Sequence, residues 1–276
     1  MSLNIKKLYK KPQVFLRLTG VSIDEFHTLC YKAQPLWQTH VRESKKVCGR
    51  PFGLIDMETH ILCLLLYYRT YITQEFIGFL CDVDDSCICR SLRRTSQVLA
   101  PALGMNKRRT VSAEEAMKLI IDCTEQRIQR PLKKQRKYYS GKRKAHTLKT
   151  ELQVTDKGQI VHISPPHPGR RHDRAIRAQG PPLRRNATVY VDSGYQGLHK
   201  DHGNTYYPYK KSKNKPLSDQ EKMHNRELAS FRVRVEHKIR QLKTFQYMGQ
   251  VHRNRRRGYG IAVNIIAGIV NMKAGF

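Results

Sequence analysis

The feature that most constrains the fold is a change in sequence pattern near residues 101–110, where Pro101, Gly104 and a basic cluster occur together. Upstream, apolar residues recur at helical spacing, and one apolar helix is expected over residues 57–68. Downstream, short β-rich runs alternate with helical ones, which is typical of an α/β fold. We therefore expect a helical domain over residues 1–110 and an α/β domain over residues 111–276.

Composition narrows the kind of partner. The 276 residues carry 52 Lys and Arg against 22 Asp and Glu, a formal charge of +30. Such a charge repels itself unless a polyanion offsets it. Because basic residues recur along the whole chain, nucleic acid is favoured over an anionic membrane surface. The alternative is an RNA-packing protein of the ribosomal type, but such proteins seldom carry the acidic residues described below.

The cysteines and apolar runs indicate the compartment. The seven cysteines are an odd number without regular spacing, which argues against a disulfide framework and suits a reducing cytoplasm. The chain starts without the apolar core of a signal peptide. Its longest apolar run, residues 61–68, is too short to span a bilayer. We expect a cytoplasmic protein without a membrane partner.

A helix-turn-helix is expected within the helical region. Thr73 can cap a short second helix, residues 81–84 form the turn, and Asp85 can cap a third helix to about residue 99. Three arginines lie off the apolar face of that third helix and could reach base edges in a DNA major groove: Arg90, Arg93 and Arg94. The alternative is a plain helical bundle with solvated arginines.

Two acidic residues follow short apolar strands in the α/β region. Asp122 ends a strand expected over residues 119–121, and Asp192 ends a strand expected over residues 187–191. Carboxylates at strand ends lie at the open edge of an α/β sheet, where sites are usually built. One such Asp is ordinary turn chemistry. Two of them in a strongly basic chain are a more specific signal.

Further elements are expected around these strands. Residues 146–155 and 159–164 are predicted to form two strands joined by a turn at 156–158. Residues 165–171 are expected to form a loop, and a short helix is expected to start at residues 172–173. A last apolar helix over residues 259–272 is predicted to pack on the sheet.

A third acid, Glu236, falls within a predicted helix. Apolar residues there recur at spacings of 3, 4, 4 and 3 and define one buried stripe: Leu228, Phe231, Val235, Ile239 and Leu242. Arg232, Glu236, Arg240 and Lys243 form a second stripe about 100° away around the helix. Glu236 can therefore face the sheet edge, or it can belong to a surface row of salt bridges with Arg232 and Arg240.

Three converging carboxylates in a basic protein suit phosphoryl-transfer chemistry. Divalent cations such as Mg²⁺ take oxygen ligands and retain waters that substrate phosphates can share. Two ions about 3.5–4 Å apart can activate the nucleophile and stabilise the leaving oxygen. No Ser-His-Asp or Cys-His spacing competes with this interpretation, and no glycine-rich phosphate loop is visible.

Four linked segments carry a family pattern. Ile-Asp-Cys-Thr-Glu at 121–125 resembles a first-acid motif, residues 138–149 a basic segment, and Val-Asp-Ser-Gly-Tyr-Gln-Gly at 191–197 a second-acid motif. Arg232, Glu236 and Lys243 match an R-x3-E-x6-K arrangement. Residues 168–169 and 172–173 are similar to the loop before the first catalytic-domain helix. Together these segments resemble DDE transposases of bacterial insertion sequences, in particular the insertion-sequence-five group. Ala229 departs from the pattern, because the family usually has Tyr there.

The resemblance implies a ribonuclease-H-like mixed sheet with flanking helices, preceded by an all-α helix-turn-helix domain. It implies a transposase that binds terminal inverted repeats, cleaves DNA strands and joins the 3′-hydroxyl ends to target DNA. Asp122, Asp192 and Glu236 would be the catalytic acids and would ligate two Mg²⁺ ions, with Mn²⁺ as a substitute. Basic residues near the site would contact DNA: Lys142, Arg143, Lys144, Arg232 and Lys243. His172 and Asp173 would be auxiliary, although Asp173 can also simply cap its helix.

The resemblance also implies partners. These are double-stranded DNA, at element ends and at the target, and a second copy of the chain in a homodimer or larger assembly on DNA. The cytoplasmic protein would then be associated with the bacterial nucleoid. Two other functions stay open: a catalytically silent DNA-binding protein derived from a transposase, and a structure-specific nuclease of the same fold. The presence of all three acids favours the active enzyme.

Overall fold

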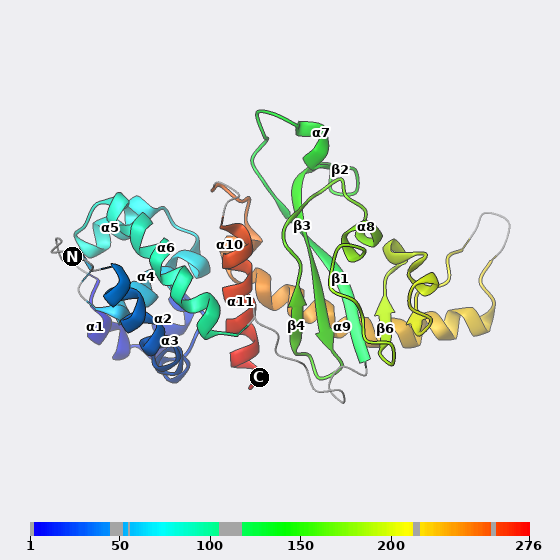
Figure 1. Ribbon diagram of the computed structural model, residues 1–276, viewed down its shortest axis with the longest axis horizontal. Coiled ribbons are helices and arrows are strands. Elements are labelled where there is room, and N and C mark those ends of the chain that lie inside the picture. The colour runs from blue at the N-terminus through cyan, green and yellow to red at the C-terminus, as the bar shows by residue number, and fades with distance from the viewer. Residues whose placement is uncertain (1–2, 45–51, 55, 105–117, 212–215, 255–257) are drawn as a thin grey trace. The chain divides into compact units, whose positions relative to one another are not determined.

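The structure, a computed structural model, describes residues 3–44, 52–54, 56–104, 118–211, 216–254 and 258–276 (Figure 1). The chain forms two compact units. The helical unit holds Met1–Lys107, Leu242–Gln250 and Arg256–Phe276, and the α/β unit holds Arg108–Gln241 and Val251–Arg255. The described helices and strands confirm the predicted class, a helical region followed by a mixed α/β region.

The helical unit is built around α4 (Met57–Thr70), whose residues from His60 to Tyr68 are all buried. It packs against α2 (Pro12–Thr19), α3 (Ile23–Ser44) and α6 (Asp85–Ala102). Short helices α1 (Ile5–Tyr9) and α10 (Gln246–Gly249) complete this layer. Tyrosines of α4 and α10 pack edge to face in the interior, with Tyr68 and Tyr247 ring centroids 5.1 Å apart. Burial of such large rings dominates the energetics of a core.

A helix-turn-helix arrangement joins α5 (Gln74–Cys81) to α6. The Thr73 hydroxyl accepts a hydrogen bond from the Phe76 amide at 3.1 Å, so the predicted cap of α5 is confirmed. The turn comes close to α5 at Gly78, where an added Cβ would lie 2.5 Å from the Val83 carbonyl oxygen. The next helix has Asp84 as its N-cap, so the prediction of Asp85 is wrong by one residue. Asp84 has the extended backbone of an N-cap but makes no side-chain capping hydrogen bond, so the backbone geometry and not a carboxylate contact marks this helix start.

The last helix, α11 (Tyr259–Lys273), packs against α6 in the helical unit. A Cβ added at Gly268 would lie 2.6 Å from the Cβ of Leu103, at the end of α6. The prediction that this helix packs on the sheet was therefore wrong. Its apolar composition predicts that the helix is buried, but composition does not indicate which element it packs against.

The α/β unit is a mixed sheet with the order β2-β3-β1-β6-β7, and β4 and β5 also pair with β3. Central β1 (Lys118–Arg127) runs antiparallel to β3 (Ala145–Thr155) and parallel to β6 (Thr188–Val191). The shorter strands are β2 (Tyr139–Ser140), β4 (Ile160–Ile163), β5 (His167–Pro168) and β7 (Thr205–Tyr206). Gly158, with φ of 86°, turns the chain between β3 and β4 as predicted. Strand β5 replaces part of the predicted loop.

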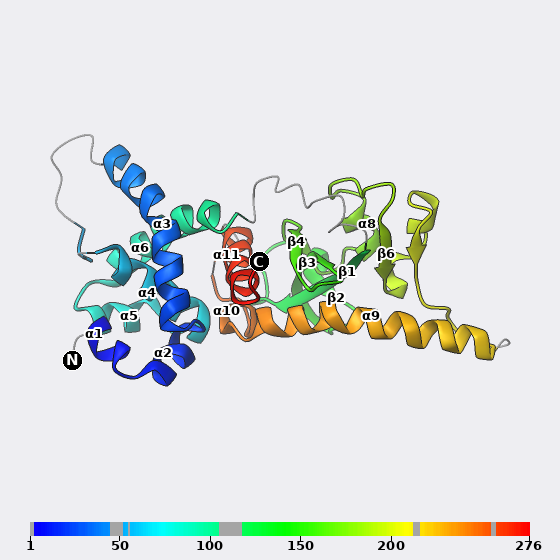
Figure 2. The same ribbon diagram turned by 90° about the horizontal axis from the view of Figure 1, so that it is seen from below.

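Helices flank this sheet, as a ribonuclease-H-like fold requires. The long helix α9 (Asp219–Lys243) runs along one face of the sheet (Figure 2). The Phe231 ring stacks on Tyr190 of β6, with ring centroids 4.6 Å apart. Shorter elements are α7 (Gln135–Tyr138), α8 (Asp173–Arg177), η1 (Ser193–Tyr195) and η2 (Leu198–Lys200). An apolar cluster fixes β6 and η1 against β1: Leu119, Ile121, Val189, Val191 and Tyr195.

Candidate active site

The register of β1 and β6 brings two of the predicted acids together. Ile121 pairs with Val191 in the parallel ladder, so Asp122 and Asp192 follow at the same level of neighbouring strands. Asp122 was predicted to end its strand, but it does not, because β1 continues to Arg127 along β3. It lies instead where β6 ends beside it. The sheet edge at this site is therefore formed by the end of the short strand β6. Asp122 lies beside that end, within the longer strand β1.

Backbone amides hold both carboxylates. Asp122 Oδ1 accepts a hydrogen bond from the Cys123 amide at 2.7 Å. Asp192 Oδ1 accepts one from the Gly194 amide at 2.7 Å, as the N-cap of η1. An added Cβ at Gly194 would lie 2.9 Å from Asp192 Oδ1 and 2.7 Å from Asp173 Oδ2. The glycine of the second-acid motif therefore leaves space for two carboxylates, one on each side.

Asp173 is the third acid at this edge. Residue 172 is the N-cap of α8 without a side-chain capping bond, and Asp173 is the first residue of the helix. Its carboxylate accepts a hydrogen bond from Lys149 Nζ at 2.9 Å. The same Lys149 nitrogen lies 3.6 Å from a carboxylate oxygen of Glu125. Asp173 is therefore tied to β3 by an ion pair, whereas His172 is exposed.

Glu236 lies on α9, with Arg232 between it and the aspartates. Arg232 Nη2 is 3.7 Å from Asp122 Oδ2 and 4.0 Å from Glu236 Oε1. The Glu236 side chain is 54% exposed, whereas that of Asp122 is 17% exposed. The predicted buried stripe is present, because Leu228, Val235 and Leu242 are buried. Glu236 thus stands at the rim of the site, linked to Asp122 through one guanidinium group.

Electrostatics distinguish Asp122 from an ordinary surface acid. Its pKa is raised from 3.8 to about 6, chiefly by burial; the charges of Asp192 and Asp173 act in the same direction, while Arg232 and the Cys123 amide act in the opposite one. Burial disfavours the charged form because water no longer solvates it, and nearby like charges add to that cost. Arg232 and its other neighbours therefore do not fully compensate the negative charge at Asp122.

A second buried carboxylate, Glu151, lies on β3 in the same unit. Its Oε1 accepts a hydrogen bond from Arg177 Nη1 at 2.6 Å, and both side chains are at most 3% exposed. The Tyr195 hydroxyl lies 3.5 Å from the other Glu151 oxygen and 3.2 Å from Cys123 Sγ. Burial raises the pKa of Glu151, and Arg177 opposes this rise. This network links β3, α8 and η1 beside the aspartates.

The predicted DNA-binding residues occupy several places. Lys142, Arg143 and Lys144 are all exposed in the turn between β2 and β3. On α6, Arg90 and Arg93 are exposed, whereas Arg94 is partly buried. The Arg94 guanidinium lies over the Phe52 ring, 3.7 Å from its centroid, which ties it to the helical core. Lys243 is the last residue of α9, and it is partly buried and counted with the helical unit.

The carboxylates at this edge have the donor chemistry of a metal site but lie apart. Among the described residues, no group of three or more His, Cys, Asp or Glu side chains is arranged closely enough to hold a metal ion. The chemistry of the available donors nevertheless fits a divalent cation, because they are oxygens and their charge is incompletely balanced around Asp122. Asp122 and Asp192 would supply the first ligands, and Glu236 on α9 is connected to Asp122 through Arg232.

Sequence reasoning missed three parts of this region. Lys149 stands within the recognised basic segment, but nothing in its spacing revealed Asp173 as its partner. The Glu151–Arg177 pair gave no signal, because its members are 26 residues apart and come from different elements. Tyr195 belongs to the second-acid motif, and its burial against Cys123 and Glu151 could have been suspected only from that motif.

Fold and site together define a nuclease-type α/β domain with acids at one sheet edge. Residues 121–271 match the family model for the DDE superfamily endonuclease. The chain is 34% identical over 265 residues to a probable transposase for insertion sequence element IS702 of Microchaete diplosiphon, with 93% of each chain covered. The protein therefore belongs to the DDE superfamily of endonucleases. No solved structure matches the chain significantly. In the described residues, no helix is long and apolar enough to cross a membrane.

Proposed function

We propose that this protein is the transposase of an insertion sequence, which binds terminal inverted repeats, cleaves DNA strands and joins the 3′-hydroxyl ends to target DNA. The observation that carries the proposal is the position of Asp122 and Asp192, which directly follow the paired residues Ile121 and Val191 at one sheet edge of a DDE-family domain. The relative named as a probable transposase supports it, since the similarity extends along 93% of both chains.

The proposed catalytic residues are Asp122, Asp192 and Glu236, acting as ligands of two Mg²⁺ ions for which Mn²⁺ can substitute. Such cations, when bound, polarise a phosphoryl oxygen and make bound water or hydroxyl a better nucleophile. Carboxylate oxygens are the donors these ions prefer. The raised pKa of Asp122 supports this role, because a buried, poorly compensated carboxylate gains most from a nearby cation.

The other residues of the edge would position these acids. Arg232 lies within 4.0 Å of Asp122 and Glu236 and would bridge the two carboxylates before DNA binds. A DNA phosphate can take over the Arg232 guanidinium, since arginine pairs well with phosphate. Lys149 would hold Asp173 beside Asp192, and Asp173 would act as an auxiliary acid.

DNA binding would be shared between the two units. Exposed Lys142, Arg143 and Lys144 would contact the backbone near the site, with Lys243 further along α9. Arg90 and Arg93 of the helix-turn-helix would reach base edges, with Arg94 supporting them. In this organisation residues 1–110 bind DNA and residues 111–276 catalyse. Paired element ends require a homodimer or larger assembly on DNA.

The test is cleavage of DNA that carries the inverted repeats flanking the gene. Purified protein should cleave it only when Mg²⁺ or Mn²⁺ is added. Asp192→Asn should lower the rate roughly a thousandfold, because a metal ligand contributes several kcal/mol to the transition state. Asp219→Asn is the matched control, since that side chain is 98% exposed on the first turn of α9. Cleavage by Asp192→Asn at the wild-type rate would refute the proposal.

The same assay separates the two alternative functions. A catalytically silent DNA-binding protein would bind the repeats tightly and leave them uncut with either cation. A structure-specific nuclease would cut branched or nicked DNA equally well with or without the repeats. The transposase should cut at the repeat ends and also join the resulting 3′ ends to a second DNA.

A further inference from the structure

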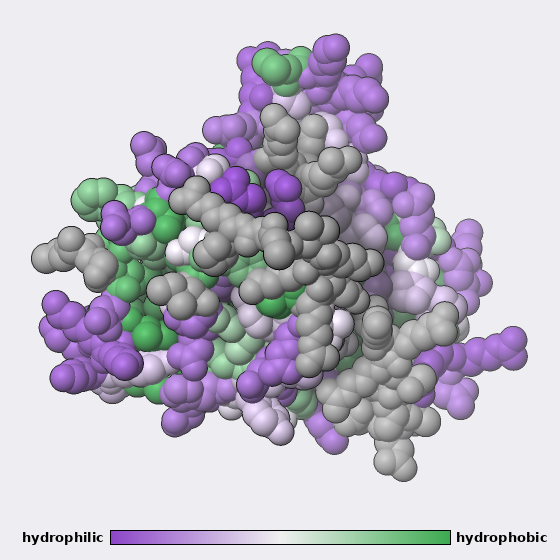
Figure 3. Space-filling view, turned by 60° about the vertical axis from the view of Figure 1, so that its left-hand side comes forward, coloured by the Kyte–Doolittle hydropathy of each residue, from purple (hydrophilic) through white to green (hydrophobic). Residues whose placement is uncertain are grey.

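A cavity of about 660 Å³ lies beside β2, the start of β3 and helix α7. It is lined by Arg130, Gln135, Arg136, Tyr139, Gly141, His146 and Arg170. Its volume falls within the range of ordinary ligand pockets, about 300–1,000 Å³. Hydrophilic residues gather over the projecting end of the molecule that carries α7 (Figure 3). None of the lining residues belongs to the proposed set of acids or DNA contacts.

Three arginines reach this cavity from three separate segments. The chain leaves β1 beside β3, where the Ile128 amide donates to the His146 carbonyl, and then reaches Arg130. Arg136 belongs to α7. Arg170 follows β5, and the Gly169 amide donates to the Thr147 carbonyl at 2.9 Å. Gly169 is needed for this approach, since an added Cβ would lie 1.9 Å from Thr147 Oγ1.

The charge of the cavity lacks an internal counter-charge. Its lining contains no Asp or Glu. In the described part of the chain, no ion pair joins Arg130, Arg136 or Arg170 to a carboxylate. These three exposed guanidinium groups give the cavity a positive potential that attracts an anion. Guanidinium groups favour phosphate, which they can grip with two hydrogen bonds.

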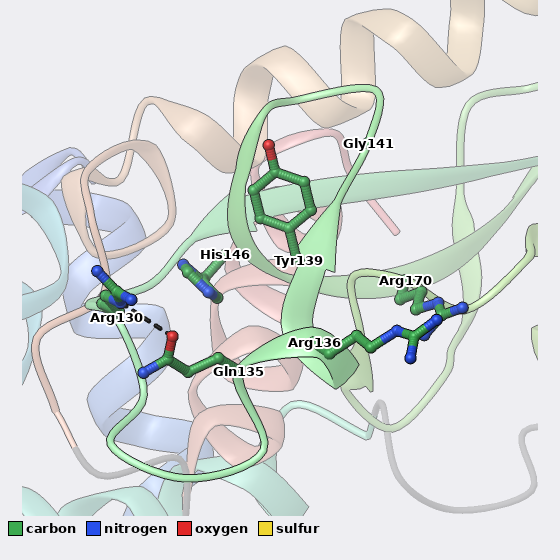
Figure 4. A pocket seen from close by; sticks show the side chains of 7 residues that line it. All are labelled: Arg130, Gln135, Arg136, Tyr139, Gly141, His146 and Arg170. Atoms are coloured by element: carbon green, nitrogen blue, oxygen red, sulfur yellow. Dashed lines mark hydrogen bonds between the residues drawn. The ribbon is translucent and has the colours of Figure 1, made fainter.

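An aromatic surface adjoins these charges. The Tyr139 side chain is 42% exposed although it lines the cavity. The His146 ring meets the Tyr139 ring at 73°, with centroids 5.7 Å apart, which fixes its orientation. Figure 4 shows Arg130 and Gln135 on one flank of Tyr139 and Arg136 and Arg170 on the other. Gln135 Oε1 accepts from Arg130 Nε at 3.0 Å, which orients its amide nitrogen for a further acceptor.

We propose that this cavity binds one unpaired nucleotide of a DNA strand. The base stacks on Tyr139, the Gln135 amide faces the base edge, and the arginines hold the flanking phosphates. A nucleotide carries an anionic phosphate, which can bind the arginines, and a flat aromatic base, which can stack on the exposed tyrosine ring. The inference rests on the proposed function, since DNA cleavage and joining supply unpaired nucleotides at strand ends.

The test compares two labelled single strands that carry the same phosphates. One is a strand of twelve thymidines, and the other is a strand of twelve abasic residues. Binding to the full chain is measured in EDTA at fixed salt. The wild type should bind the thymidine strand about tenfold more tightly, because stacking of one base is worth about 1–3 kcal/mol. Tyr139→Ala should remove this preference, and Tyr139→Phe should keep it. Arg136→Gln and Arg170→Gln should weaken binding to both strands.

Matched controls separate the cavity from general basic surface. Tyr31→Ala removes a tyrosine that is 79% exposed outside the cavity and should keep the preference for bases. Arg185→Gln removes the same charge from an exposed site outside the lining, and it should weaken binding less than Arg136→Gln. A wild-type protein without preference for bases, or a Tyr139→Ala variant that retains it, would overturn the inference.

The outcome is independent of catalysis. Binding in EDTA requires no metal ion, so a protein that fails to cleave repeat DNA can still be tested for the cavity. If Tyr139→Ala binds both strands as the wild type does while the wild type cleaves repeat ends, the cavity inference fails and the proposed transposase stands. If the wild type fails to cleave repeat ends but Tyr139→Ala loses the preference for bases, the proposed transposase fails and the cavity inference stands.

Discussion

Two carboxylates in the same sheet, Glu151 buried and Asp122 partly buried, have different surroundings. Glu151 receives a guanidinium nitrogen at 2.6 Å, with further contacts from Gln153 and Tyr195. Asp122 has its guanidinium nitrogen, from Arg232, at 3.7 Å and has two other aspartates in its field. Burial raises the pKa of both acids. Only Glu151 has a cation at hydrogen-bonding distance.

The difference indicates two roles for buried charge. A carboxylate that is fully paired inside the protein fastens elements together, as Glu151 does for β3 and α8. A carboxylate left with neighbouring acids and a distant arginine is unfavourable until a cation arrives, which is a property of functional sites. By this comparison Glu151 connects β3 to α8 through its ion pair, and Asp122 lowers stability until a cation binds.

The largest effect should come from breaking the paired carboxylate. Arg177→Met leaves Glu151 buried without its cation and should lower the free energy of unfolding by about 3–5 kcal/mol. Urea unfolding measures the change. Adding Glu151→Gln to Arg177→Met should recover part of the loss. Arg185→Met, at an exposed position, should change stability by less than about 0.5 kcal/mol. If Arg177→Met changes the free energy of unfolding no more than Arg185→Met does, the proposed difference between Glu151 and Asp122 is wrong.

The opposite sign is expected at Asp122. Without divalent cations, Asp122→Asn should raise the free energy of unfolding by about 2–3 kcal/mol above pH 6. Its folded pKa of about 6 exceeds the ordinary value of 3.8, so the charged form penalises the folded state. This penalty grows between pH 4 and 6 and vanishes below pH 4, where both states are protonated. Unfolding curves at pH 4 and 7.5 measure it, and an Asn variant that is less stable at pH 7.5 would contradict it.

A smaller effect is expected at Lys149, which is paired but only partly buried. Lys149→Met should cost roughly 1–2 kcal/mol, because Asp173 and Glu125 lose their cation. Asp173→Asn in the same background should restore much of the loss. Since Asp173 already raises the pKa of Asp122, removing Lys149 should shift the pH transition of the Asp122 effect upwards. An unchanged transition would mean that Asp173 is insulated from Asp122.

Much of the fold follows from sequence pattern. Periodicity placed α4, α5, α6 and α9 and the strands β1, β3, β4 and β6, since local pattern and turn chemistry act over a few residues. It failed where the answer depends on distant partners. The extension of β1 beyond Asp122 depends on β3, and the position of α11 depends on α6. Neither partner can be read from the residues of the element itself.

The sequence predicted those parts of the site that belong to recognisable motifs. Asp122 and Asp192 were found because each follows an apolar strand, and the ladder then set them side by side. From the helix pattern alone, Glu236 could face the site or belong to a surface salt bridge. In the structure it is an exposed residue beside the site and also lies 4.0 Å from Arg232, so both interpretations were partly right. Lys149 with Asp173, and Glu151 with Arg177, escaped because ion pairs between elements have no sequence period.

The most direct test of the uncompensated acids is the effect of a divalent cation on thermal unfolding. At pH 7.5, Mg²⁺ or Mn²⁺ should raise the melting temperature of the wild type, because a ligand that binds only the folded state stabilises it. The rise should be lost in Asp122→Asn and Asp192→Asn, kept in Asp219→Asn, and reduced in the wild type at pH 5, where Asp122 is largely protonated. An equal rise in all four proteins, or none in the wild type, would contradict the proposal that these acids hold the catalytic cation.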